Sequence, residues 1–452
     1  MDTNEYIGGY LDRARKAQEE FETYDQDQVD LAVKTIARIV DENSEMLARL
    51  AVDETGMGVY EDKVIKNRMK AKIIWNSLKG KKSVGIISRN EQTGITEIAK
   101  PMGVVSAITP MTNPIVTPMS NAMFALKGRN AIIITPHHKS LKTSSMVVSL
   151  INEALAEIHA PENLIQIIDQ QSRENTKALI EKTDIVIATG GMGMVKTAYS
   201  SGKPALGVGA GNVQCIIDKD ADLAAAVPMI ITGRAFDNGI ICSAEQSVIV
   251  PAAVYDEAVD AFRKNGAYVA TDKDELDRLR NTLFQFGAMN KDVVGQSVAK
   301  IAAMAQIEVP EGTRVIVAQT EGPGDILGKE KMCPVLALYR YDDFKEAVAI
   351  AGANLEMEGK GHSVAIHSNT VENIEYAALS LSVSRFVINQ CSATSAGGSF
   401  FNGFAPTNTL GCGSWGGNSI SENLDYKHLI NVSRIGYYMK DNQVPSEEEL
   451  WA

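Results

Sequence analysis

The sequence predicts an α/β protein built around two mostly parallel sheets, each with helices on both faces. Short apolar runs alternate with segments of helical periodicity between residues 104 and 188, and a second alternation begins after residue 225 and continues to about 410. Such alternation is typical of strand–helix–strand units whose strands lie parallel. A chain of 452 residues is also too long for one small core, so two or three compact units are expected.

Before the first alternation, the pattern indicates two helices and a hairpin. Apolar residues recur at helical spacing over 4–22, and the same periodicity returns over 29–55. Residues 83–100 are instead strand-like, because Ile86-Ile87 and Ile95 to Ile98 flank the polar sequence Arg-Asn-Glu-Gln. We therefore expect two amphipathic helices packed on a core, followed by two strands joined by a turn.

Each alternation predicts a series of elements. The first gives strands at 104–109, 131–135, 164–168 and 185–188, and helices at 117–127, 142–158 and 173–182. The second gives strands at 245–250, 315–318, 364–367 and 385–388, and helices at 254–264 and 344–353. Residues 392–418 fit neither period and are rich in Gly, Ser, Thr and Asn. Long irregular segments of this kind usually line a site in compact enzymes.

Composition and charge argue against several classes of function. Forty-four basic against fifty-six acidic side chains give a net charge of −12, which argues against general binding to nucleic acids or to anionic membranes. No apolar run approaches the roughly 18–20 residues that span a bilayer. The start, with Asp2, Glu5 and Asp12, does not have the pattern of a secretory signal. The five cysteines are scattered without metal-ligand spacing, so we expect no metal site and a reducing cytoplasm.

Cys242 is the candidate nucleophile. It follows the turn-forming sequence Asp237-Asn238-Gly239 and precedes the strand at 245–250, an arrangement that presents a thiol on a loop. The alternative is a cysteine buried for packing alone. Asn113 follows the strand at 104–109, at the end where the ligand crevice of a parallel sheet opens. Its side-chain amide can therefore stabilise an oxyanion together with the Cys242 N–H, although Asn-Pro alone indicates only a turn.

Two stretches carry signals of dinucleotide binding. Gly190 and Gly191 follow the strand at 185–188 and open a helix, so their N–H groups can approach a pyrophosphate, although the spacing departs from GxGxxG. His137, His138 and Lys139 follow the strand at 131–135, with no acidic residue nearby. Basic groups there tolerate a 2′-phosphate, whereas an acid would bind a free ribose hydroxyl. We therefore favour NADP over NAD, with a solvated basic loop as the alternative.

Glu330 and His362 complete the candidate set. Glu330 lies in Glu-Lys-Met-Cys-Pro-Val, and alone it would be taken for a surface charge. His362 follows Gly359-Lys360-Gly361, and an imidazole with an ordinary pKa of about 6.5 is a suitable proton acceptor for an incoming thiol. A histidine with a purely structural role is the alternative.

The chain resembles the CoA-acylating aldehyde dehydrogenases in a set of motifs that occur in the right order between about residues 5 and 440. These motifs are Thr112–Pro114, Gly207–Asn212, Asp237–Cys242, Glu330–Val335, Gly361–His362 and Leu410–Ser419. The likeness is closest to the CoA-dependent enzymes that act on succinate semialdehyde, through Val52–Tyr60 and Asn113–Asn121.

That resemblance implies a mechanism. Cys242 would attack the aldehyde, Asn113 would stabilise the oxyanion, and transfer of a hydride to the nicotinamide would leave a thioester. Glu330 would anchor the nicotinamide ribose, and His362 would handle the proton of the incoming thiol. The cofactor would be bound by Thr109, Pro110, His137, His138, Lys139, Gly190, Gly191, Gly207 and Glu330.

Gly207 is the informative departure from the hydrolytic members of the superfamily. It stands at the position where those enzymes carry the glutamate that activates water, and glycine offers no base. The resemblance therefore implies that coenzyme A takes the acyl group and that the product is an acyl-CoA. A hydrolytic enzyme and a catalytically silent oligomeric scaffold remain the alternatives.

The resemblance also implies three domains and an oligomer. Residues 1–82 and 101–225, with about 411–432, would form the cofactor-binding domain, 226–410 the catalytic domain, and 83–100 with 433–452 an oligomerisation flap. A homodimer or a dimer of dimers would result. Relatives that enter bacterial microcompartments carry an N-terminal extension not seen here, so we expect a cytoplasmic enzyme.

Substrate choice rests on fewer residues. A short aldehyde with an anionic tail needs a basic or hydroxyl-rich wall, for which Arg234, Ser243, Ser392 and Thr394 are the candidates. Succinate semialdehyde is the first choice, sulfoacetaldehyde the second, and acetaldehyde or propionaldehyde the third.

Overall fold

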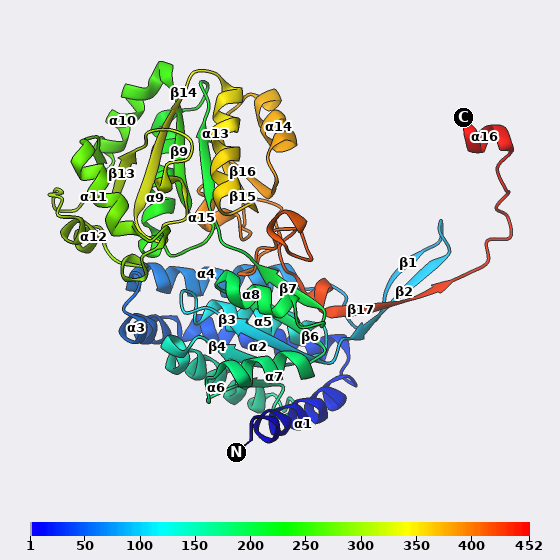
Figure 1. The fold of residues 1–452 in the computed structure, drawn as a ribbon. Helices are drawn as coiled ribbons and strands as arrows, with labels where there is room; N and C mark the ends of the chain where they lie inside the picture. The colour runs from blue at the N-terminus through cyan, green and yellow to red at the C-terminus, as the bar shows by residue number, and fades with distance from the viewer. Residues whose placement is uncertain (1) are drawn as a thin grey trace.

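Two parallel sheets form the centres of two lobes, and a narrow arm projects from the first lobe (Figure 1). The computed structural model describes residues 2–452. The α/β class predicted from the sequence is confirmed, as is the alternation of strands and helices on which it rests.

The first lobe contains a five-stranded parallel sheet in the order β5-β4-β3-β6-β7. Its strands are β3 (Val104–Thr109), β4 (Ala131–Pro136), β5 (Ile165–Ile167), β6 (Ile185–Thr189) and β7 (Ala205–Val208). The strand order reverses between β3 and β6, and a ligand crevice opens beyond the carboxyl ends of strands at such a point. The predicted sites after β3 and β6 therefore lie at the same edge of the sheet.

Helices cover both faces of this sheet. They are α1 (Thr3–Phe21), α2 (Gln26–Glu42), α3 (Ser44–Thr55), α4 (Tyr60–Leu78), α5 (Val116–Lys127), α6 (Leu141–Glu157), α7 (Arg173–Lys182) and α8 (Met192–Tyr199). Right-handed crossovers place α5 and α6 on one face, where α2 packs over them, and α7 on the other, where it meets α1. The predicted helix over 29–55 is in fact two helices, because Asn43 ends α2 by donating its side-chain amide to the Ile39 carbonyl (2.8 Å).

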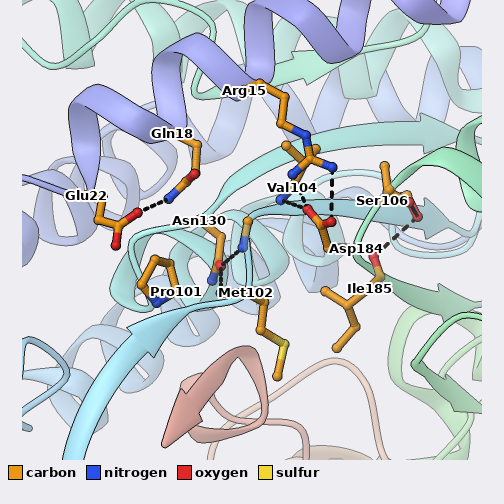
Figure 2. Close-up of polar contacts among 12 residues, drawn as sticks. Arg15, Gln18, Glu22, Pro101, Met102, Val104, Ser106, Asn130, Asp184 and Ile185 are labelled. Atoms are coloured by element: carbon orange, nitrogen blue, oxygen red, sulfur yellow. Dashed lines mark hydrogen bonds and ion pairs between the residues drawn. The ribbon is translucent and has the colours of Figure 1, made fainter. Parts of the chain in front are cut away.

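Partly buried polar contacts hold the amino end of the sheet in place (Figure 2). Asp184, just before β6, accepts a hydrogen bond from the Val104 N–H (2.7 Å) and pairs with Arg15 of α1. The Asn130 side-chain oxygen accepts from the N–H groups of Met102 (2.7 Å) and Gly103 (3.0 Å). These contacts fix the first residues of β3, β4 and β6. They thereby help to position the sheet edge at which the three strands end.

The second lobe contains seven parallel strands in the order β10-β13-β14-β9-β8-β15-β16. The strands are β8 (Val213–Ile217), β9 (Glu245–Pro251), β10 (Ala267–Ala270), β13 (Val315–Gln319), β14 (Val335–Tyr341), β15 (Gly361–His367) and β16 (Val383–Ile388). Its helices are α9 (Leu223–Ala235), α10 (Tyr255–Lys264), α11 (Lys273–Leu283), α12 (Val298–Ala305), α13 (Phe344–Met357), α14 (Val371–Ser380) and the short α15 (Ser392–Ser395), and a small hairpin pairs β11 (Phe284–Gln285) with β12 (Ala288–Met289).

The position of β8 differs from the expected division of the chain. Residues 213–217 were assigned to the first domain, yet β8 pairs with β9 on one side and β15 on the other, in the middle of the second sheet. The expected domain boundary between residues 225 and 226 therefore lies too late in the chain, because β8 belongs to the second lobe and precedes it. Neither β7 nor β8 was predicted as a strand, because the two short runs flank the glycine-rich residues 207–212.

The arm is a three-stranded antiparallel sheet in the order β1-β2-β17. It combines β1 (Gly85–Asn90) and β2 (Ile95–Pro101), the predicted hairpin, with β17 (Ile430–Gly436) near the carboxyl end of the chain. The turn lies at 91–94 rather than within Arg-Asn-Glu-Gln, because Gly94 supplies the positive φ (64°) that it requires. Beyond β17 the chain extends to α16 (Glu447–Trp451), at the red end of Figure 1. Among residues 2–452, no helix is long and apolar enough to cross a membrane.

Candidate active site

The candidate residues gather between the two lobes. There, the carboxyl ends of strands in the first sheet face the amino ends of strands in the second. Asn113 and Gly190 follow the carboxyl ends of β3 and β6 in the first lobe. Cys242 and Glu330 precede the amino ends of β9 and β14 in the second lobe, and His362 lies at the start of β15. Asn113 lies beyond the carboxyl end of β3, as predicted, whereas the position of Cys242 and Glu330 at the amino-end edge of the second sheet was not predicted.

The loop before Cys242 has an unusual backbone. Asp237 and Asn238 both have positive φ values (52° and 53°), a conformation that costs energy in residues other than glycine. The fully buried Asp237 carboxylate stabilises it by accepting hydrogen bonds from the Val59 N–H (2.9 Å) and from the ammonium groups of Lys63 (3.1 Å) and Lys66 (2.6 Å). These charges depress the pKa of Asp237, so the carboxylate stays ionised. The conformation of the nucleophile loop is therefore imposed by α4 and the residues just before it.

Arg234 also supports this loop. It is fully buried, and its guanidinium donates to the carbonyls of Glu245 (2.9 Å) and Gly239, on either side of Cys242. The prediction that Arg234 lines the substrate pocket is wrong, because these bonds direct its charge to the backbone of the loop.

Cys242 is partly buried and meets the glycine loop of residues 207–212 at Gly211. A Cβ atom on Gly211 would lie 1.9 Å from the Cys242 carbonyl oxygen, so only glycine fits there. Burial raises the pKa of the Cys242 thiol to about 12, and the nearby Glu330 adds to this shift. In this state Cys242 is a thiol, and it must lose its proton before or during attack.

Glu330 lies on the other side of Gly211. Its carboxyl oxygen accepts a hydrogen bond from the Gly211 N–H (3.2 Å), and its own N–H donates to Glu358 (3.1 Å). Burial raises the pKa of Glu330 to about 8, with the charge of Glu358 as the second cause. Glu330 is thus a buried, largely protonated carboxyl beside the nucleophile rather than a surface charge.

Asn113 is joined to the nucleophile loop through one side chain. The Lys66 ammonium donates to the Asn113 side-chain oxygen (2.7 Å) and, as described above, to Asp237. The predicted oxyanion donor and a residue of the nucleophile loop, from different lobes, therefore share Lys66 as a hydrogen-bond donor. Lys66 was not among the predicted site residues, because it lies on a helix that the apolar pattern did not single out.

His362 is completely buried, and neither of its ring nitrogens has a hydrogen-bond partner among the described residues. Burial lowers the pKa of His362 to about 3, and the positive charge of Arg385 adds to the effect. Arg385 also donates to the His362 carbonyl (2.8 Å) and to the Gly411 carbonyl (2.8 Å), which anchors the glycine-rich segment. The ordinary pKa of about 6.5 on which the sequence argument relied is therefore not found, and a neutral imidazole with this pKa is a weak proton acceptor. No described contact joins it to Cys242, so its role stays a prediction.

The residues expected at the nicotinamide cofactor fit a dinucleotide. The buried Thr109 hydroxyl at the end of β3, next to Pro110, has no partner among the described residues. A Cβ on Gly190 or Gly191 would meet nothing within 4 Å, so packing does not require glycine there and space remains for a ligand. Gly207 is different, because a Cβ there would meet side-chain atoms of Val195 (2.8 Å) and Tyr199 (2.9 Å).

The basic group after β4 is exposed in part. The His137 and His138 rings lie 4.3 Å apart, and Lys139 is exposed beside them. One acid does approach this region, although none is near in the sequence. Glu54 accepts hydrogen bonds from the N–H groups of Lys142 (2.8 Å) and Thr143 (2.7 Å), so its carboxylate caps α6.

Three other residues were predicted to line the substrate pocket, and their environments differ. The Ser243 hydroxyl donates to the Ala393 carbonyl (3.3 Å), and Thr394 is exposed. The Ser392 hydroxyl is buried and has no partner among the described residues. None of these side chains supplies a positive charge.

Helices α4 and α5 contribute further polar side chains near the nucleophile, including a positively charged one. Lys70 donates to the carbonyls of Gly397 (2.8 Å) and Thr407 (3.2 Å). Burial lowers the pKa of Lys70 to about 8, and its proximity to the Cys242 thiol opposes this shift. On α5, the Thr117 hydroxyl and both side-chain amide atoms of Asn121 are buried without a partner among the described residues. The one available signal was the spacing of Lys63, Lys66 and Lys70 on a single helical face.

Comparison with known proteins agrees with this site. The model of the aldehyde dehydrogenase family matches residues 2–428. Succinate-semialdehyde dehydrogenase (acetylating) of Clostridium kluyveri is 56% identical over 98% of both chains. Sulfoacetaldehyde dehydrogenase (acylating) of Bilophila wadsworthia is 40% identical over 98% of this chain and 97% of its own.

The fold agrees as well. The crystal structure of an acetylating aldehyde dehydrogenase from Geobacillus thermoglucosidasius superimposes with a TM-score of 0.94 at 36% identity, covering 98% of both chains. With the family model and these relatives matched over almost the full length, the chain belongs to the aldehyde dehydrogenase family, in its CoA-acylating branch.

Proposed function

We propose that this enzyme interconverts a short aldehyde with an anionic tail and its acyl-CoA, with succinate semialdehyde as the preferred aldehyde and NADP as the cofactor. The observation that carries the choice of substrate is Lys70, a partly buried cation next to Cys242. The carboxylate at the far end of a four-carbon aldehyde needs such a charge. Thr117 and Asn121 of α5 offer buried polar atoms that have no partner among the described residues. The 56% identity to the C. kluyveri enzyme supports the same substrate.

The chemistry assigned to the chain begins at sulfur. The Cys242 thiol gives its proton to water as its sulfur forms a bond to the aldehyde carbon, and the electron pair of the broken C=O π bond moves to the oxygen, which becomes an alkoxide. The Cys242 N–H and the Asn113 amide donate hydrogen bonds to that alkoxide, which stabilises it by an amount typical of an oxyanion hole. A nicotinamide cofactor, when bound, would supply the acceptor for the hydride that leaves the same carbon. The Cys242 thioester that remains is attacked by the sulfur of CoA, which releases Cys242 and gives the acyl-CoA.

The other site residues would prepare these steps. Glu330 would bind the nicotinamide ribose. His362, whose ring nitrogens have no partner among the described residues, would accept the proton of the CoA thiol, which requires its pKa to rise from about 3 once the substrates are bound. Thr109, Pro110, Gly190 and Gly191 would contact the dinucleotide.

The choice of NADP rests on His137, His138 and Lys139. Glu54, which caps α6 just after these residues, is engaged there through both carboxylate oxygens. It is therefore less available to a ribose 2′-hydroxyl, whereas the basic group can meet a 2′-phosphate. Measuring kcat/KM for NADP and NAD with one aldehyde tests this preference, and a higher value for NAD would refute it.

Transfer to CoA rather than to water is supported at Gly207. The Val195 and Tyr199 side chains leave no room for a glutamate at this position. The decisive experiment follows NADP reduction with succinate semialdehyde, with and without CoA, against Cys242→Ala. Strict CoA dependence that the variant abolishes is expected, and equal rates without CoA would refute the acyl-transfer mechanism.

Sulfoacetaldehyde is the second candidate, because it too has an anionic end and the B. wadsworthia relative is named for it. Acetaldehyde and propionaldehyde come third. Comparing kcat/KM for the three classes ranks them, and a preference for acetaldehyde would remove the anionic pocket.

We further propose a cytoplasmic homodimer, or a dimer of dimers, that assembles through the arm. Five free cysteines fit a reducing compartment. Tyr437, Tyr438 and Trp451 are exposed beyond β17, where a partner chain could cover them. Light scattering of a chain truncated after residue 432 is expected to report a monomer, and an unchanged mass would refute the role of the arm.

A further inference from the structure

We infer that Lys66 is a positioning residue that sets the orientation of the Asn113 amide, so that its NH₂ group, and not its oxygen, faces the oxyanion. This rests on the oxyanion role proposed for Asn113. Lys66 is buried, and its ammonium lies 2.7 Å from the Asn113 side-chain oxygen and 2.6 Å from an Asp237 carboxylate oxygen.

The direction of the amide follows from the chemistry of the ammonium. A lysine side chain has three donors and no acceptor, so only the oxygen of an amide can face it. The Asn113 NH₂ group must then point along the other branch of the same planar amide, away from Lys66. Without Lys66, both orientations of the amide become available, and one of them places an oxygen against the developing negative charge.

Lys66 itself is held in place from the second lobe. Asp237 keeps its carboxylate against Lys66 through bonds from Lys63 (3.1 Å) and the Val59 N–H (2.9 Å). Gly58 allows this close approach, because a Cβ there would lie 2.0 Å from an Asp237 oxygen. Asp237 is in the loop that presents Cys242, and in a Lys66 variant it would keep its bonds from Lys63 and the Val59 N–H, so the position of the nucleophile does not depend on Lys66 alone.

The charges around Lys66 suit this fixed role. The groups facing it are Asp237 and Asp62, which are acidic, and Lys63 and Lys70, which are basic. Asp62 accepts a hydrogen bond from the Asp237 N–H (2.7 Å). Two acidic side chains and two further lysines surround the Lys66 ammonium, so the positive and negative charges around it nearly cancel. Among these groups, Lys66 bridges Asn113 and Asp237.

A double-mutant cycle tests the inference, with the intact protein and the burst of NADPH in a single turnover as the readout. Asn113→Ala is expected to slow the burst about 10²- to 10³-fold. Lys66→Met is expected to slow it at least tenfold, with the KM for the aldehyde changed less than about threefold. Lys66→Met combined with Asn113→Ala is expected to be no slower than Asn113→Ala alone, because Lys66 acts through Asn113.

Three further measurements separate positioning from general structural damage. Alkylation of Cys242 by iodoacetamide needs no oxyanion donor, so its rate in Lys66→Met is expected to stay within about threefold of the parent. Lys66→Arg keeps a donor for both partners and is expected to recover most of the loss; it also remains informative if Lys66→Met does not fold. The exposed Lys72→Met, on the same helix, is the matched control.

Each failure has its own signature. Additive losses in the double variant, or alkylation that slows in parallel with the burst, would overturn the role of Lys66. A full burst in Lys66→Met together with a slow burst in Asn113→Ala would do the same. A full burst in Asn113→Ala would instead overturn the oxyanion role on which the inference rests.

Discussion

The backbone of Gly211 lies directly against the carbonyl of Cys242, so closely that a Cβ on Gly211 would come within 1.9 Å of that oxygen. The contact joins the amino ends of β8 and β9 and leaves the Gly211 N–H facing Glu330. Placement of Cys242 therefore depends on the absence of a side chain at Gly211, 31 residues earlier in the sequence.

Gly211→Ala is expected to displace the nucleophile loop, because the obstructing atoms belong to the backbone and cannot rotate away. We expect kcat to fall at least 100-fold, on the basis that ångström-scale misplacement of reacting groups costs about that much. Steady-state kinetics of the acylating reaction measures it. Gly8→Ala is the control, since a Cβ on Gly8 meets nothing within 4 Å. Equal activity of the two variants would mean that the loop tolerates the shift.

The reactivity of Cys242 should follow its protonation. Burial raises the pKa of this thiol to about 12, so the reactive thiolate is scarce at neutral pH and increases about tenfold per pH unit. Alkylation of the protein without cofactor by iodoacetamide should therefore accelerate without levelling between pH 7 and pH 10. Cys242→Ala gives the background from the other thiols, including the partly buried Cys391. A plateau at pH 8 would contradict the shift.

Local patterns predicted the parts of this enzyme that depend on local physics. The apolar runs at β3, β4 and β6 are buried on both faces, so each was visible as a strand. Glycine and asparagine before Cys242 were visible as a loop. In these cases the residues that make the element are neighbours in the sequence.

Contacts between distant residues could not be predicted in this way. Lys66 and Asp237 are 171 positions apart, and in the sequence each is an ordinary charged residue. Arg234 was wrongly given to the substrate because its nearness to Cys242 in the sequence says nothing about which way its guanidinium points. Lys70 was missed for the same reason, since a lysine on a helix is usually solvated.

Lys70→Met should change the selectivity of the enzyme more than its chemistry. Loss of one charge-assisted hydrogen bond costs about 1.5–3 kcal/mol, which predicts a fall of about 10- to 150-fold in kcat/KM for succinate semialdehyde. Butyraldehyde has the same carbon chain without the carboxylate, and its kcat/KM should fall less than about threefold. That comparison removes any effect of the lost bonds to Gly397 and Thr407, which both aldehydes would experience alike.

One control and one contrary outcome complete the test of this prediction. Lys72→Met, exposed on the same helix, should leave both aldehydes unaffected. If Lys70→Met lowered kcat/KM equally for the two aldehydes, Lys70 would support the loop at 397–407 and would not bind the carboxylate.

Glu245, at the start of β9, should make stability depend on pH. Burial raises the pKa of this fully buried carboxyl from an ordinary value of 4.5 to about 7, and one of its oxygens accepts only the Ser392 N–H (2.6 Å). The folded protein therefore holds this proton more tightly than the unfolded chain. Its contribution to stability is fully present below pH 4.5 and is lost as the pH rises through 7, a change of about 3 kcal/mol.

Glu245→Gln removes this titration while keeping an oxygen to accept from Ser392. The free energy of unfolding of the variant, relative to the parent, should therefore increase by about 1–3 kcal/mol between pH 5 and pH 8. Any constant cost of the new NH₂ group cancels in that difference, because it does not depend on pH. Denaturant titrations at the two pH values measure it, with the exposed Glu257→Gln as the control. A difference that stays level would mean that Glu245 ionises in the folded protein as readily as in water.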